Sequence, residues 1–180
     1  MRKKASILIY ILVITVMALL QTSFFPQFIL LRIKPDLVLL FVISIGLLKG
    51  YREGIIVGLI GGIITGIVSW NLWGLYILGY CLAGLAAGIV PEKVETDNFL
   101  VPLLSSVIGS AGFALILSGV AILLDIYYPT FADLYKIPVF LIWNAIFALP
   151  VFFMCKNVIV PPGRELDFDV SPKNKGYTID

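Results

Sequence analysis

The chain has 180 residues, of which 60% are hydrophobic and 13% are charged, and its net charge is +2. Soluble domains are typically about 45–50% apolar and about 25% charged, so this composition excludes most soluble functions and indicates a polytopic membrane protein. The small net charge gives no reason to expect nucleic acid as a partner. Residues 54–91 carry no charged side chain, and this run is about right for two membrane helices of roughly 20 residues each.

Six apolar segments follow one another along the chain, and together they predict an all-α integral membrane bundle. The first follows Arg2, Lys3 and Lys4 and lacks a small-residue cleavage site, so it is interpreted as a retained anchor rather than a signal peptide. We expect helices at 6–25, 35–48, 54–69, 72–90, 99–124 and 137–154. These helices form one membrane domain over 1–160, and the polar composition of the tail over 161–180 predicts flexibility.

The second and third segments are short for helices that cross a membrane. A helix over 54–69 rises roughly 24 Å, whereas the hydrocarbon core is roughly 30 Å thick. Six crossings are the favoured interpretation. Five crossings with a re-entrant hairpin are the alternative.

The positions of Lys and Arg predict the orientation, because cytoplasmic loops carry an excess of both residues. With six crossings, both termini lie on the same side as the loops after the second and fourth segments. Ten of the 13 cations fall on that side, and the remaining three are Arg32, Lys34 and Lys136. The sequence therefore predicts that both termini lie in the cytoplasm. Four aromatic residues are expected to anchor the outer boundary: Trp70, Trp73, Tyr127 and Tyr128.

The sharpest local pattern is a series of glycines four residues apart, which places them on one stripe of a helix. The stripe consists of Gly50, Gly54, Gly58, Gly62 and Gly66, and the fourth segment repeats the spacing at Gly84 and Gly88. Small residues at this spacing let two helix backbones approach closely, and such packing drives helix association in lipid. We interpret the stripe either as internal helix packing or as a groove for the transmembrane helix of a partner.

Polar side chains within the apolar segments are expected to form hydrogen bonds between helices. They include Gln21, Ser105, Ser106, Ser110 and Asn144. Charged side chains are expected only at the segment ends, within reach of water.

Three residues at segment ends are candidate partner contacts. Pro35 and Asp36 begin the second segment at its outer end, and Arg52 lies at an inner end. An aspartate at a helix start is favoured by the positive end of the helix dipole. Helix capping and contact with an extracytoplasmic partner both remain open for Asp36.

Catalysis has little support in this sequence. The chain has no histidine, which excludes Ser-His dyads and the His-ligated metal sites of intramembrane proteases. No pair of aspartates falls at membrane depth for acid–base chemistry, and no phosphate-binding glycine loop is present. Cys81 and Cys155 fit no metal or redox spacing. We therefore expect neither enzymatic activity nor a cofactor.

In their order and spacing, four stretches of the chain resemble the rod shape-determining protein MreD family. They are LQTS at 20–23, KPDLVLL at 34–40, LKGYREG at 48–54 and LWGLYILGY at 72–80. The resemblance covers roughly residues 5 to 160. The sequence departs from the family at Gly66, where members often carry an acidic residue, so no role of that carboxylate is carried over.

The resemblance implies a non-enzymatic scaffold subunit of the bacterial cell-elongation (rod) complex, a multi-pass protein of the bacterial cytoplasmic (inner) membrane. Its implied partners are a single-span MreC-type protein, the peptidoglycan synthases RodA and PBP2, the MreB cytoskeleton and membrane lipid. The family also resembles the six-helix membrane subunits of energy-coupling-factor transporters. A substrate-binding subunit of a vitamin-type transporter is therefore the alternative function. The short, glycine-interrupted second and third segments favour it, and it predicts a pocket that opens to the outer side.

Overall fold

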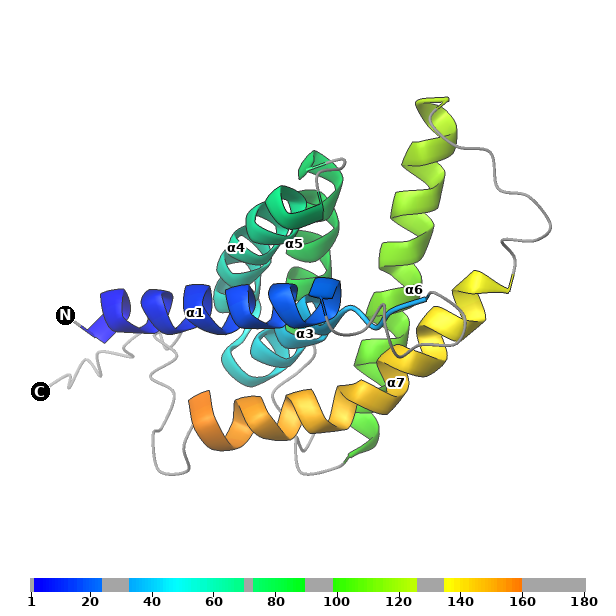
Figure 1. Ribbon diagram of the computed structural model, residues 1–180. Helices are drawn as coiled ribbons and strands as arrows, with labels where there is room; N and C mark the ends of the chain where they lie inside the picture. The colour runs from blue at the N-terminus through cyan, green and yellow to red at the C-terminus, as the bar shows by residue number, and fades with distance from the viewer. Residues whose placement is uncertain (1, 24–32, 70–72, 90–98, 126–134, 160–180) are drawn as a thin grey trace, which may run out of the picture.

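A computed structural model describes residues 2–23, 33–69, 73–89, 99–125 and 135–159 of this chain. Its helices are α1 (Arg2–Ser23), α3 (Leu37–Lys49), α4 (Tyr51–Ser69), α5 (Trp73–Ile89), α6 (Leu100–Leu123) and α7 (Lys136–Met154) (Figure 1). A π-helical turn, η2 (Cys155–Ile159), continues α7. The described part of the chain contains no strand, so the prediction of an all-α membrane bundle is confirmed.

The helices begin and end within about one turn of the apolar segments expected from the sequence. Four of them are long and apolar enough to cross a membrane, namely α1, α4, α6 and α7 with its π-helical extension. The outer aromatic residues Trp70, Tyr127 and Tyr128 and the tail over 161–180 lie outside the described residues, whereas Trp73 is the first residue of α5.

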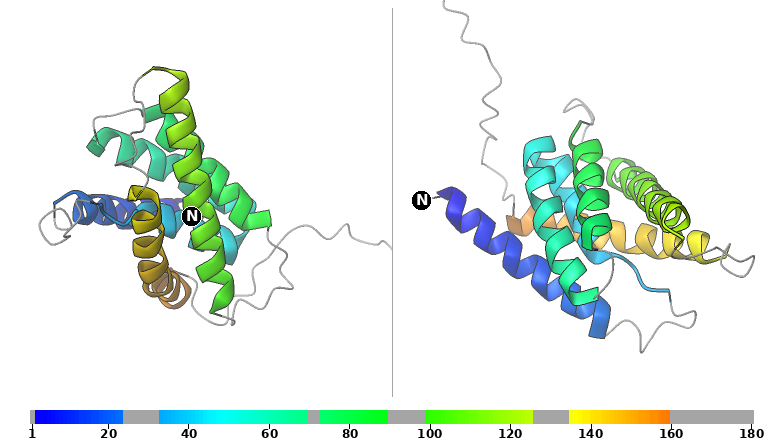
Figure 2. Two further views of the ribbon diagram at one scale, coloured as in Figure 1. Left: turned by 90° about the vertical axis from the view of Figure 1, so that its right-hand side faces the viewer. Right: turned by 90° about the horizontal axis from the view of Figure 1, so that it is seen from above.

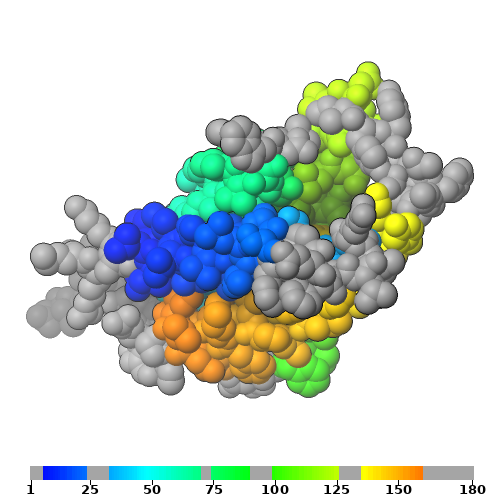
Figure 3. All heavy atoms as spheres, viewed as in Figure 1, coloured from blue at the N-terminus to red at the C-terminus, as the bar shows by residue number. Residues whose placement is uncertain are grey.

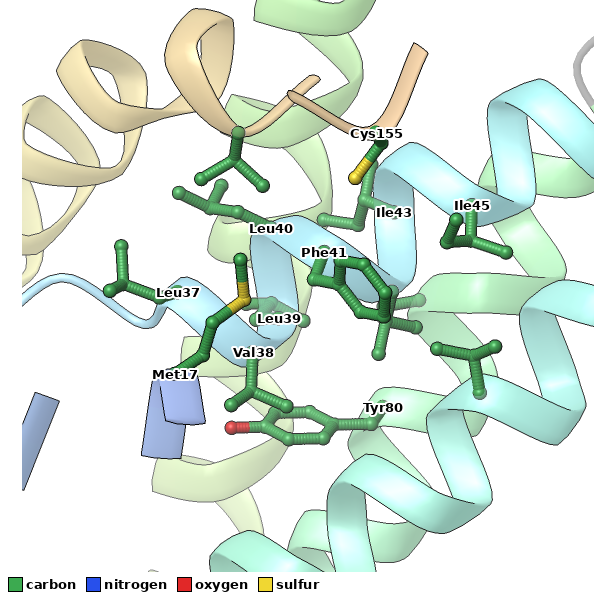
Figure 4. Packing of buried hydrophobic residues seen from close by; sticks show 14 of the residues in the cluster. Met17, Leu37, Val38, Leu39, Leu40, Phe41, Ile43, Ile45, Tyr80 and Cys155 are labelled. Atoms are coloured by element: carbon green, nitrogen blue, oxygen red, sulfur yellow. The ribbon is translucent and has the colours of Figure 1, made fainter. Parts of the chain in front are cut away.

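Helix α3 is the central element of the bundle. It contacts α1, α4, α5, α6, α7 and η2, and eleven of its 13 residues are buried. Figure 4 shows its side chains enclosed on several sides, with Met17, Tyr80 and Cys155 among their neighbours. A helix of 13 residues rises only about 20 Å, which is short of a hydrocarbon core about 30 Å thick. Because protein rather than lipid surrounds α3, its length does not have to match the bilayer.

Gly50 alone connects α3 to α4. Its φ of 83° lies in the left-handed region, where a side chain would be strained. Its N–H donates to the Gly46 carbonyl at 2.8 Å, and its own carbonyl accepts from the Gly54 N–H at 3.0 Å. One residue thus ends α3 and begins α4. Helix α4 is long enough to span a membrane and α3 is not, so this connection is compatible with either six crossings or a re-entrant hairpin.

Two helices, α1 and α6, lie at the periphery. Helix α6 buries only Pro102, Ser106, Ser110 and Phe113, and its end at Leu123 projects beyond the other helices (Figures 1 and 2). Helix α1 covers one face of the molecule, on which α7 is also visible (Figure 3). Apolar residues such as Leu8 and Leu12 of α1 point outward, as expected for helices surrounded by lipid.

Candidate functional site

The glycine stripe lies between α4 and α5. A Cβ atom added to Gly58 would be 2.6 Å from the carbonyl oxygen of Tyr80, and one added to Gly62 would be 2.7 Å from the backbone nitrogen of Ile77. Gly54 and Gly84 meet backbone to backbone across the same interface. The backbones of α4 and α5 are therefore so close that only glycine, which has no Cβ atom, fits at these positions.

The remaining stripe residues have different positions. Gly88 of α5 packs on the backbone of Tyr51 and Gly50, so Gly50 belongs to the interface although it precedes α4. Gly66 is buried in the last part of α4. Of the two roles considered for the stripe, internal packing is the one present in the structure. A partner helix on this face would have to displace α5.

A buried polar network surrounds the start of α3, near the predicted outer end of the bundle. The Asp36 N–H donates to Asn144 Oδ1 at 2.9 Å, and the Leu37 N–H donates to Gln21 Oε1 at 3.1 Å. Asn144 Nδ2 in turn donates to Ser110 Oγ at 2.8 Å. Hydrogen bonds between helices were the expected role of Gln21, Ser110 and Asn144, and all three form them. They join α1, α6 and α7 to the first peptide groups of α3.

Asp36 is the capping residue of α3. Its Oδ1 accepts from the Leu39 N–H at 3.0 Å, and its carboxyl group also accepts from the Tyr80 hydroxyl, 2.6 Å from Oδ2 and 2.8 Å from Oδ1. Its side chain satisfies a helix-end N–H group that no backbone carbonyl can reach. Tyr80 comes from α5, so the network draws on five helices.

The expected position of Asp36 near water is wrong. Asp36 is only 9% exposed and Pro35 is buried as well, because α3 begins inside the bundle and the other helices extend past its start. Hydropathy marks the end of an apolar segment but does not reveal which neighbours cover that end. Neither side chain is available to an outer partner. Arg52, the third candidate contact, is exposed, with its guanidinium carbon 5.8 Å from the centre of the Tyr51 ring.

A second polar cluster lies at the other end of α3. Lys49 Nζ donates to the Tyr10 hydroxyl at 2.9 Å, and that hydroxyl donates to Glu53 Oε2 at 3.2 Å. Lys49 Nζ also lies 5.2 Å from the centre of the Tyr10 ring. The phenol thereby joins a cation of α3 to an anion of α4. The roles of Tyr10 and Tyr80 were not predicted from the sequence. A tyrosine within an apolar segment is nevertheless a signal, because a buried hydroxyl needs a partner.

A cavity of about 360 Å³ lies beside the Asp36 network. Its walls come from α1, α4, α5, α6, α7 and the segment 33–36. Lys34 and Lys136 supply cations, Thr65 supplies a hydroxyl, and Phe113 and Phe140 supply apolar surface. Among the described residues, no group of three or more His, Cys, Asp or Glu side chains could hold a metal ion.

Comparison with known families identifies the chain at the level of the family. The family model of the rod shape-determining protein MreD matches residues 1–158. The chain belongs to the MreD family. The match includes all six helices, and it confirms the resemblance drawn from the sequence. No curated protein and no solved structure matches the chain. Membership gives this MreD-family chain a role in determining rod shape, within a family of membrane proteins that is not a known enzyme family.

Proposed function

We propose that this chain is a non-enzymatic scaffold subunit of the rod complex in the cytoplasmic membrane. It binds the transmembrane helix of a single-span MreC-type protein and helps to position peptidoglycan synthesis. RodA, PBP2 and the MreB cytoskeleton act beside it. The observation that carries this proposal is the family match over residues 1–158, which covers the whole helical bundle. The buried polar groups support a scaffold, because they bond to one another and to the start of α3.

The exposed face of α6 is the best surface for the partner helix. Ser105, Gly112 and Gly119 are seven residues apart and so lie on nearly the same side of this helix. A Cβ added to Gly112 or Gly119 would meet no other atom of the described chain within 4 Å. Unlike the stripe of α4, these glycines are not covered by another of the described helices. A backbone with such a surface allows close approach of a second membrane helix.

Replacing both Gly112 and Gly119 with leucine should release the MreC-type partner while leaving the bundle intact. Leucine at these two positions fills open space, whereas it blocks the close backbone contact that the partner needs. We expect recovery of the co-expressed partner on tagged protein to fall about tenfold, equivalent to about 1.4 kcal/mol of binding free energy.

The matched control replaces Leu8 and Leu12 on the exposed face of α1 with isoleucine, which should leave recovery unchanged. Unchanged recovery with the α6 variant would reject this face as the docking surface. If the wild-type chain recovers no MreC-type partner from native membranes, the scaffold proposal itself fails.

The proposed orientation has a direct test. A cysteine in place of Asn157, an exposed residue of η2, should react with a membrane-impermeant maleimide only in inverted vesicles, because the C-terminal end of α7 faces the cytoplasm. Both native cysteines, Cys81 and Cys155, are replaced with alanine for this measurement. Labelling in intact spheroplasts would reverse the assignment of the C-terminal end.

The transporter alternative predicted a pocket on the outer side, and the cavity beside Lys34 and Lys136 is compatible with it. The family match favours shape determination, since that role and not transport defines the matched family.

A further inference from the structure

The cavity beside Asp36 combines surfaces of two opposite kinds. Thr65 of α4 contributes a polar atom, whereas Phe113 and Leu117 of α6 and Phe140 of α7 contribute hydrocarbon. Its volume of about 360 Å³ lies within the range of about 300–1,000 Å³ that is usual for pockets that bind small molecules. The space is therefore large enough for a ligand with both a polar and an apolar part.

Among the described residues that line this cavity, the balance of charge is positive. Lys34 and Lys136 line it, and both side chains are exposed. Asp36 carries the one carboxyl group among the described lining residues, and this group already accepts hydrogen bonds from the Tyr80 hydroxyl and the Leu39 N–H. Two cations thus accompany one carboxyl group among these residues, and Lys34 also interacts electrostatically with that carboxyl group. An anionic ligand meets a favourable field here.

The Thr65 hydroxyl is a second, independent feature of the cavity. Thr65 is only 2% exposed, and its Oγ1 lies near the Tyr80 phenol without a hydrogen bond of good geometry to any described residue. A buried hydroxyl without a partner costs about 1–3 kcal/mol, so such groups are rare in folded proteins. Because Thr65 lines the cavity, an occupant with an oxygen atom can supply the missing partner.

We propose that the cavity binds an anionic phospholipid. Its phosphate lies between Lys34 and Lys136, an oxygen of the headgroup pairs with the Thr65 hydroxyl, and the start of an acyl chain packs on Phe113, Leu117 and Phe140. Charge-assisted hydrogen bonds from the lysines supply selectivity for anionic over zwitterionic headgroups. The apolar wall supplies selectivity for a lipid over a free phosphate ion. Bilayer lipid surrounds α6 and α7, so the proposed ligand is present next to the cavity.

Native mass spectrometry of the full chain provides the test. The probes are phosphatidylglycerol and phosphatidylcholine with identical acyl chains, each added to delipidated protein in detergent. We expect the wild-type chain to retain one phosphatidylglycerol about tenfold more than phosphatidylcholine, and Lys34→Ala with Lys136→Ala to remove this preference. Lys156→Ala removes one cation at the other end of the bundle and is the control for a loss of charge away from the cavity; it should retain the preference.

A second pair of variants tests the apolar wall. Ala114→Phe places a ring in the cavity and should lower retention of phosphatidylglycerol at least about fivefold, whereas Leu115→Phe on the exposed side of α6 should not. The thermal midpoint of each variant separates loss of lipid from loss of fold.

Equal retention of both lipids by the wild-type chain would overturn the proposal. So would full retention by folded Ala114→Phe or by the double lysine variant. Inorganic phosphate is added last, as a competitor for the bound lipid. Displacement of phosphatidylglycerol by millimolar phosphate would identify a simple anion site and reject the lipid, whereas persistence of the bound lipid supports it.

Discussion

Replacing Gly58 with alanine should destabilise the bundle by about 2 kcal/mol, although the same change usually favours a helix. The added Cβ would lie 2.6 Å from the Tyr80 carbonyl oxygen and 2.9 Å from the Cys81 Cα. These neighbours are backbone atoms that no rotamer change can move, so α4 and α5 must separate along their interface. Overpacking of this kind costs about 1–3 kcal/mol. Reversible unfolding by sodium dodecyl sulfate in mixed micelles measures the difference in unfolding free energy.

Gly112→Ala is the matched control for this prediction. It is also a glycine within a helix, but no described atom lies within 4 Å of the added Cβ. Alanine should stabilise the protein there by about 0.5–1 kcal/mol, because glycine loses more backbone entropy on folding. Equal effects at Gly58 and Gly112 would contradict the close α4–α5 contact. Gly58→Leu should abolish the folded protein, so loss of a partner from that variant would say nothing about docking.

Asp36→Ala should destabilise the bundle by about 2–3 kcal/mol. The change removes the acceptor of the Leu39 N–H and leaves the buried Tyr80 hydroxyl without its partner. Loss of a helix cap costs about 1 kcal/mol, and a stranded buried polar group costs about 1–3 kcal/mol. The same unfolding titration provides the measurement. Asp36→Asn keeps an oxygen for both donors and should cost clearly less.

A double-mutant cycle with Tyr80→Phe isolates the bond between the carboxyl and the phenol. The two changes together should cost less than the sum of the single changes by about 1 kcal/mol or more, because each partner is stranded only while the other remains. Additive effects would indicate that the two groups do not interact in the membrane. Arg52→Ala, at an exposed residue outside this network, should show no coupling to either change.

Features that depend on local composition could be predicted from the sequence. Apolar runs locate the helices. Unpaired peptide groups are costly in lipid, and a helix is the local structure in which such a run pairs its own peptide groups. The spacing of Gly54, Gly58 and Gly62 predicted a close backbone contact. The spacing did not identify the other surface, since α5 and a helix from another chain offer the same kind of contact.

The buried network could not be predicted in the same way. Gln21, Asp36 and Asn144 are far apart in sequence, and their meeting depends on how α1 and α7 pack around α3. Each of these residues, considered alone, is ordinary at its position near the end or in the middle of an apolar segment, so none of them indicates the other two. Asp36 was expected near water because segment length and charge position describe one helix at a time. The enclosed start of α3 results from the whole bundle.

The short central helix α3 has a consequence for how the protein is made. A helix of 13 residues is too short to span the hydrocarbon core of a bilayer by itself. The first peptide groups of α3 take their acceptors from Gln21, which leaves the ribosome before them, and from Asn144, which leaves long after them. The hydrogen bonds at the start of α3 are therefore complete only after α7 has been made. We expect the packing of α3 to finish late in the synthesis of the bundle.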